Sequence, residues 1–244
     1  MANRKNKIDN NKSAVSVHNF SSQGQATRHK GDKTERIHHS HSRLERKYLH
    51  VIEFSKAVTD YKDNYPLEIE ETLQIADQLG VKHNSINGEF KELTTDFFLE
   101  VTRGSEIIKL ARAVKQLDNF TKRVCEKFDI ESEYWKKRSI DFKIITDKEL
   151  KTAFVNNIEK LHKWREWKIN ASQEEIYHVL RKNFETTDQL VANALNDISL
   201  RENISLSVLR PALCYFIWHQ KIQCDLNRNL DFDRSYFTYH IEFT

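Results

Sequence analysis

The stretch of sequence that decides the fold begins at Thr95, reads TDFFLEVTRGSEIIKLARAVK, and ends at Lys115. It contains two runs rich in aromatic and aliphatic residues, 95–101 and 107–115, which are typical of β-strands. Arg103-Gly104-Ser105 lies between them, and a short connection that contains glycine favours a hairpin. The sequence therefore predicts two neighbouring strands that pair with each other.

Each predicted strand carries a charged residue of interest. Because side chains alternate between the two faces of a strand, Asp96 is expected on the same face as Phe98 and Glu100. On the second strand, Ala113 and Lys115 are expected to share a face. An aspartate and a lysine on adjacent strands can then meet across the pair.

Upstream of the hairpin, ordered structure is predicted to begin with a helix near Ser42. Ser42-Arg43-Leu44-Glu45 fits a capping box, and apolar residues recur at helical spacing to about Phe54. Residues 58–67 are expected to be extended, with Pro66 limiting the strand. Asn87-Gly88 is a strong turn signal.

Downstream, helical and extended patterns alternate. A charged amphipathic helix is predicted at about 120–138, a strand at 141–145, and a helix from Asp147 to about Trp164. Strands that alternate with helices indicate an α/β domain. We assign residues 35–165 to it.

The last third of the chain has a different pattern. Residues 165–170 read as a linker, and Pro211 is expected in the first turn of the third helix that follows it. The three short helical patterns lie at about 172–183, 187–200 and 205–220. Two strand-like runs, 222–226 and 237–243, then surround Asn227-Arg228-Asn229. Three helices followed by a hairpin predict a small, helical, winged-helix-like C-terminal domain, residues 171–244.

The composition is that of a globular protein, with 39% hydrophobic and 31% charged residues. The net charge is only +3, but residues 1–47 hold eleven Lys and Arg against four Asp and Glu. Residues 1–34 lack periodicity and are predicted to form a disordered basic arm, suited to DNA or to solubility. His38, His39 and His41 are predicted to lie in a solvated tail rather than in a metal site.

Membrane and secreted classes are not expected. The longest apolar run is far shorter than the roughly 20 residues that span a bilayer, and the polar N-terminus does not read as a secretion signal. Cys125, Cys214 and Cys224 form no metal-ligand pair. They are predicted to be reduced thiols in a cytoplasmic protein.

Asp96 and Lys115 are the residue types that hydrolysis of a phosphodiester requires. Carboxylates hold divalent cations that bridge the phosphate and activate water, and a lysine stabilises the charge that develops in the transition state. An aspartate, a gap and then acid-x-Lys is the pattern of restriction-endonuclease-like folds. From the spacing alone, a surface salt bridge between two common residues stays open as an alternative.

Several separate segments extend this pattern in a fixed order along the chain. They are Asn64-Tyr65-Pro66-Leu67, Glu71-Thr72, Ile75-Ala76, Leu79-Gly80-Val81-Lys82-His83, Thr94-Thr95-Asp96-Phe97, Ala113-Val114-Lys115, Tyr134-Trp135 and Ile140-Asp141-Phe142-Lys143-Ile144. Over about residues 42–165, their order and spacing resemble the TnsA family of transposase endonucleases. The resemblance implies a restriction-endonuclease-like N-terminal nuclease domain.

The resemblance also implies which residues carry the chemistry. The family's catalytic residues fall on Glu45, Asp96 and Lys115. Asp96 would bind the metal, and Glu45 would bind metal or position water, unless Glu45 serves only the capping box. Glu53, predicted on the solvated side of the same helix, is the fallback for Glu45. His50 and His83 are predicted to be structural.

Two positions depart from the family pattern. Ala113 stands where the family usually carries Gln, two residues before the catalytic lysine, and alanine offers no side-chain oxygen. The backbone carbonyl of Val114 and water are therefore expected to complete the coordination of Mg²⁺, for which Mn²⁺ would substitute. Asn64 stands where the family tends to have Gln, and it keeps the amide with a shorter reach.

The function that the resemblance implies is metal-dependent cleavage of the 5′ ends of a transposon. A TnsB-type partner transposase would cut and join the 3′ ends, and a TnsC-type AAA+ regulator would contact the C-terminal domain. Transposon-end DNA would be the substrate. Two alternatives stay open: a subunit that binds DNA and partners without cutting, which Ala113 motivates, and a stand-alone restriction or repair nuclease on the same fold.

Overall fold

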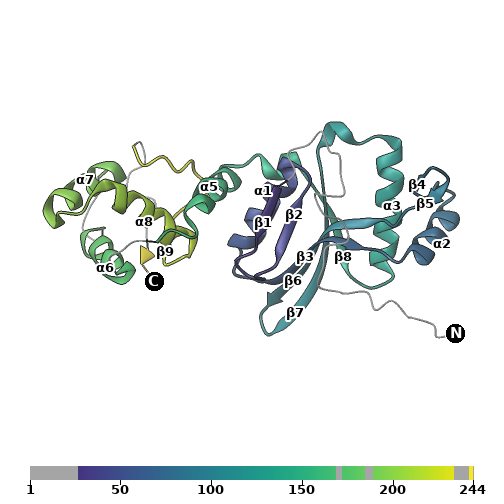
Figure 1. Ribbon diagram of the computed structural model, residues 1–244, viewed down its shortest axis with the longest axis horizontal. Helices are drawn as coiled ribbons and strands as arrows, with labels where there is room; N and C mark the ends of the chain where they lie inside the picture. Colours follow the sequence, from purple (N-terminus) through teal and green to yellow (C-terminus); the bar gives the residue numbers. More distant parts are fainter. Residues whose placement is uncertain (1–26, 169–171, 185–188, 234–241, 244) are drawn as a thin grey trace. The chain divides into compact units, whose positions relative to one another are not determined.

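The computed structural model describes residues 27–168, 172–184, 189–233 and 242–243, and the chain divides after Leu150 into two compact units (Figure 1). Each unit has its own buried core. Most of the predicted basic arm, residues 1–26, lies outside the described residues.

A four-stranded mixed sheet is the centre of the first unit. Its strands are β3 (Val58–Pro66), β6 (Thr94–Arg103), β7 (Glu106–Lys115) and β8 (Asp141–Thr146), in the order β3-β6-β7-β8. The predicted hairpin is confirmed: β6 and β7 pair antiparallel, and Gly104 in the connection has a φ of 63°. β7 and β8 pair in parallel, which requires a crossover between them.

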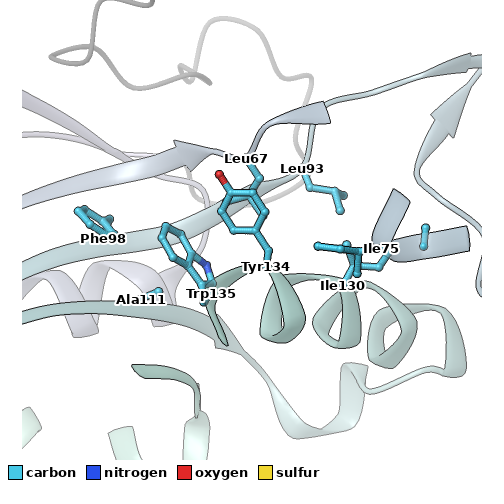
Figure 2. Close-up of a cluster of buried hydrophobic side chains, with 9 residues drawn as sticks. Leu67, Ile75, Leu93, Phe98, Ala111, Ile130, Tyr134 and Trp135 are labelled. Carbon is cyan, nitrogen blue, oxygen red and sulfur yellow. The ribbon is translucent and has the colours of Figure 1, made fainter. Parts of the chain in front are cut away.

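Helix α3 (Lys122–Lys136) makes this crossover and matches the predicted helix within two residues at each end. With α2 (Ile69–Leu79) it covers one face of the sheet. Figure 2 shows the core that they bury. The buried residues are Leu67, Ile75, Ala76, Leu93, Phe98, Ala111, Ile130, Tyr134 and Trp135. Helix α1 (Arg43–Phe54) packs on the other face, where Tyr48 meets the edge of Phe97.

Ordered structure begins earlier than the sequence predicted. A hairpin of β1 (Thr27–Lys30) and β2 (Ile37–Ser40) precedes α1, so residues 27–34 are not a disordered arm. His38 and His39 lie in β2 and are buried, so the prediction that they lie in a solvated tail is wrong. The pattern failed here because the hairpin is stabilised by side chains of α1 and β3, not by its own periodicity.

The helix predicted from Asp147 to Trp164 is interrupted. It consists of α4 (Asp147–Leu150), α5 (Ala153–Leu161) and a 3-10 turn, η3 (His162–Trp164). Thr152 causes the break, because its hydroxyl accepts a hydrogen bond from the backbone N–H of Val155 at 3.2 Å and caps α5. Since α5 packs on α8, the contacts of the chain divide before the predicted limit at residue 165.

In the second unit, α6 (Gln173–Phe184), α7 (Val191–Glu202) and α8 (Leu206–Trp218) enclose a core with α5. Pro211 lies in the second turn of α8 rather than in the first. Strands β9 (Ile222–Gln223) and β10 (Glu242–Phe243) pair antiparallel over two residues each. The predicted turn at 227–229 instead belongs to a loop that hydrogen-bonds to the buried amide of Asn157, so a winged helix is not confirmed.

The smaller elements complete the first unit. Strands β4 (Ser85–Ile86) and β5 (Glu89–Phe90) form a hairpin around the predicted Asn87-Gly88 turn, and a 3-10 turn, η2 (Leu117–Asn119), precedes α3. All three cysteines are free, as predicted. Among the described helices, none has the length and apolar character needed to cross a membrane.

Candidate active site

Asp96 lies where the backbone pairing of β6 and β7 stops. The last pair towards this end joins Phe97 and Arg112. One residue further along, the carboxylate of Asp96 accepts a hydrogen bond from the backbone N–H of Val114 at 2.6 Å. A side-chain oxygen thus takes the place of a ladder carbonyl, and this fixes the Asp96 carboxylate beside β7.

The alternation of side chains breaks between Thr95 and Phe98. Phe97 contacts Tyr48 of α1, and its neighbour Phe98 stacks on Trp135 of α3. These two residues therefore alternate between the faces, as expected for a strand. Thr95 also faces α3, because its hydroxyl accepts a hydrogen bond from the Trp135 indole N–H at 2.9 Å. Residues three apart in a regular strand lie on opposite faces, so the strand is not regular between Thr95 and Phe98, and the expected shared face of Asp96, Phe98 and Glu100 stays a prediction.

Glu45 closes the capping box that the sequence predicted at the start of α1. The hydroxyl of Ser42 accepts from the backbone N–H of Glu45 at 3.1 Å. One carboxylate oxygen of Glu45 accepts from the Ser42 hydroxyl at 2.8 Å, and the other accepts from the backbone N–H of His41 at 2.7 Å. Each carboxylate oxygen has a second lone pair, so the cap does not exhaust the capacity of Glu45 to bind a cation.

Electrostatics link Glu45 and Lys115 to Asp96. Desolvation and then the negative charge of Glu45 raise the pKa of Asp96 to about 7, although the Val114 hydrogen bond and the charge of Lys115 act in the opposite direction. Glu45 and Lys115 therefore each lie within electrostatic reach of Asp96. The arrangement brings together two carboxylates and an ammonium, and their catalytic roles stay a prediction.

The donor set at this point suits a hard divalent cation. Two carboxylates that repel each other are stabilised when a cation lies between them. The N–H of Val114 points to Asp96, and in an extended strand the carbonyl of the same residue points to the same side. A Val114 carbonyl with regular strand geometry would face the same side as Asp96, whereas Ala113 is buried and offers no side-chain oxygen.

The protein side chains alone do not make a complete metal site. Among the described residues, no group of three or more His, Cys, Asp and Glu is arranged to hold an ion. A cation bound here would take its remaining ligands from backbone oxygen, water and the substrate phosphate, as Mg²⁺ commonly does.

Glu131 of α3 is a buried acid that the sequence analysis missed. Its carboxylate accepts a hydrogen bond from the hydroxyl of Thr95 at 3.0 Å, and Thr95 is in turn held by Trp135. Burial, and then the charge of Asp96, raise the pKa of Glu131 well above its usual range. The available signal was its place on the buried stripe of α3, directly after Ile130.

Glu53 is not on the solvated side of α1, which corrects the expectation for it. It is 6% exposed, and its carboxylate accepts a hydrogen bond from the hydroxyl of Tyr61 on β3. His38 nearby stacks on Tyr61, and its ring shares a 2.6 Å hydrogen bond with Asp63. Glu53 thus belongs to the buried contact with the β1–β2 hairpin, not to the carboxylate pair at Asp96.

The remaining polar residues that the sequence singled out have structural contacts. The ring of His83 hydrogen-bonds to the Thr72 hydroxyl at 2.9 Å. The side-chain amide of Asn64 donates to the carboxylate of Asp63 at 3.1 Å and to the carbonyl of His39. Asn64 also has a φ of 48°, a conformation that asparagine tolerates better than most residues.

Comparison with known proteins bears on the same region. Residues 55–147 match the family model described as TnsA-like endonuclease N terminal. The chain is 28% identical over 201 residues to the Transposon Tn7 transposition protein TnsA of Escherichia coli. The matched region covers 79% of this chain and 71% of that protein. Asp96 and Lys115 lie inside the matched range, and Glu45 lies before it.

Proposed function

Since the chain belongs to the TnsA family and carries a TnsA-like endonuclease domain, we propose that it cuts transposon-end DNA with the help of a divalent metal ion. The observation that carries this proposal is the Asp96 carboxylate fixed beside β7 by the Val114 N–H, with Glu45 and Lys115 close enough to act on its charge. A buried carboxylate held beside a second one is destabilised when ionised, and a bound cation reverses that destabilisation. We propose Mg²⁺, with Mn²⁺ as a substitute.

The chain's own residues then have separate tasks. The Asp96 carboxylate, fixed by the Val114 N–H, would hold the cation together with the Val114 carbonyl. The ammonium of Lys115 would face the phosphate and stabilise the charge that develops on it. Glu45 would orient water or contact the cation from the start of α1. A cation at this point would supply positive charge to the phosphate and make water more acidic.

The partners follow from the family and are part of the proposal. The protein would cleave the 5′ ends while a TnsB-type transposase processes the 3′ ends, and a TnsC-type AAA+ regulator would contact the second unit. That unit has a recess lined in part by Lys160, Trp164 and Arg210, which could accept a segment of the regulator.

A nicking assay tests the proposal. The full chain, the partner transposase, Mg²⁺ and transposon-end DNA should give nicks at the 5′ ends. Asp96→Ala and Lys115→Ala should each lower the nicking rate by about 100-fold or more, while Lys143→Ala, an exposed lysine on β8, should leave it unchanged. Equal rates in all four proteins would overturn the proposal. Efficient cutting of unrelated DNA without the partner would instead identify a stand-alone nuclease.

Ala113 favours one second candidate, a subunit that binds DNA and partners without cutting. If the missing oxygen only weakens metal binding, Ala113→Gln should lower the Mg²⁺ concentration needed for half-maximal nicking. Thermal unfolding of the same variant would report whether the larger side chain fits this buried position. Intact DNA binding with no nicking in any metal, in both proteins, would support the non-cutting subunit.

A further inference from the structure

A row of three cations leads away from Asp96, and we call Lys115, Lys127 and Arg123 the cationic row. Lys127 and Arg123 lie one turn apart on α3, and Lys115 ends β7. Lys127 is within electrostatic reach of both of the others. Arg123 and Lys127 in turn act on His83, which precedes the β4–β5 hairpin. The row therefore runs from the carboxylates to this hairpin.

The three cations repel one another, and the acids near them offset part of this repulsion. Burial lowers the pKa of Lys127, and the charges of Arg123 and Lys115 lower it further. Glu126 pairs with Arg123 at 2.9 Å. Glu131 is close to Lys127, but its raised pKa favours the uncharged form. An anion bound along the row would relieve the repulsion among the three cations.

The β4–β5 hairpin presents apolar side chains at the far end of the row. Ile86 and Phe90 are 56% and 55% exposed. The turn between them is tight, with a φ of 52° at Asn87 and 82° at Gly88. A guanidinium N–H of Arg123 donates to the carbonyl of Lys82, which ties the start of α3 to the segment that leads into the hairpin. The row and the hairpin thus form one surface.

We propose that this surface is the DNA-binding track on one flank of the cleaved bond. The cationic row would contact phosphates, and Ile86 and Phe90 would pack against the nucleic acid beyond it. The charges are complementary, because Lys and Arg side chains next to a phosphodiester-cutting site would face a polyanion. Apolar side chains at a hairpin tip suit contact with sugars or base edges. The inference rests on the proposed function, because the carboxylate pair marks where the substrate phosphate lies.

Salt dependence of DNA binding tests the track. Binding of the full chain to a transposon-end duplex is measured over a range of salt concentrations without divalent metal, so that cleavage plays no part. Lys127→Gln and Arg123→Gln should each reduce the slope of log affinity against log salt by about 0.9, since each removes one phosphate contact. Ile86→Ser with Phe90→Ser should weaken binding several-fold without changing the slope, because these residues carry no charge.

Matched variants on the same helix provide the control. Lys136→Gln and Lys137→Gln remove the same charge from exposed positions at the other end of α3 and should leave the slope unchanged. Equal slopes in row and control variants would overturn the inference while leaving the proposed function intact. Binding too weak to measure in the unaltered chain, together with no nicking, would overturn both. Arg123 also donates to the Lys82 carbonyl, so its loss could disturb the fold. Thermal unfolding of Arg123→Gln reports such a disturbance, and Arg123→Lys keeps the positive charge and should keep the slope.

Discussion

The fold disfavours the ionised form of the Asp96 carboxyl group, and a bound cation would stabilise that form. Its neighbours offer one hydrogen bond, from Val114, and one attractive charge, from Lys115, against burial and the charge of Glu45. Since the pKa of about 7 is above the ordinary value, the folded protein binds a proton that the unfolded chain releases between the two values. Ionised Asp96 therefore destabilises the metal-free protein, increasingly as the pH rises towards 7.

This gives a prediction for the pH dependence of nicking. Protons compete with the cation for Asp96, so at Mg²⁺ concentrations below saturation the single-turnover rate should rise with pH through a midpoint near the Asp96 pKa of about 7. Glu45→Gln removes one cause of the raised pKa but keeps a residue that can complete the capping box. Its residual activity should level off at a lower pH. A profile with the same midpoint in both proteins would contradict the electrostatic link between Glu45 and Asp96.

The positions of single residues were predictable where a local pattern fixes them, while their catalytic roles stay predictions. The capping box placed Glu45 correctly at the start of α1, and the two strands placed Asp96 and Lys115 at ends that meet. Glu131 was not predictable in this way, because its role depends on Thr95, 36 residues away in the sequence. Hydrogen bonds between distant side chains leave no periodic trace in the sequence.

At the scale of elements, the β1–β2 hairpin explains the largest errors of the sequence analysis. Glu53 was expected in solvent and His38 in a tail, yet both are buried where the hairpin meets α1 and β3. Polar side chains can be buried when each finds a partner, as Glu53 does with Tyr61 and His38 with Asp63. Hydrophobic periodicity cannot detect such an interface, because it assigns polar residues to solvent.

The hairpin contact predicts loss of stability in acid. Burial alone would raise the pKa of Glu53, but hydrogen bonds from His29 and Tyr61 and the charges of His29 and Lys33 lower it overall. A lowered carboxyl pKa stabilises the folded state above the unfolded pKa and loses that contribution as the pH falls through the folded value. Glu53→Gln should therefore lower the free energy of unfolding by about 1–3 kcal/mol near neutral pH and by less in acid.

Urea unfolding at about pH 7 and about pH 3.5 checks this. Glu106→Gln serves as the control, since Glu106 is an exposed carboxylate at the start of β7. It should change the unfolding free energy little at either pH. If the unfolding free energy that Glu53→Gln loses stays the same at both pH values, or grows in acid, the ionised form of Glu53 is not what stabilises the hairpin contact.

Over the full chain two domains were expected, and the contacts of the described residues divide after Leu150, earlier than the expected limit at residue 165. The apolar residues of α5, such as Val155, Ile158 and Leu161, continue the helical pattern that begins at Asp147. Periodicity reports that such residues are buried, but not in which core. Only the contacts of α5 with α8 show that it belongs to the second unit. The α/β character of the first unit was predictable because alternating strands and helices allow few arrangements.

If Glu45 takes part in cutting as proposed, its helix-cap contacts have a consequence for how related proteins would lose activity. A descendant that stopped cutting would still gain from a glutamate three residues after Ser42, because that side chain holds the beginning of a helix. Lys115 has no comparable second task, since it makes no hydrogen bond within the described part of the chain through its side chain. Among related sequences, an inactive copy should therefore lose the lysine first. It should keep the glutamate for longer, because the helix cap still needs that side chain.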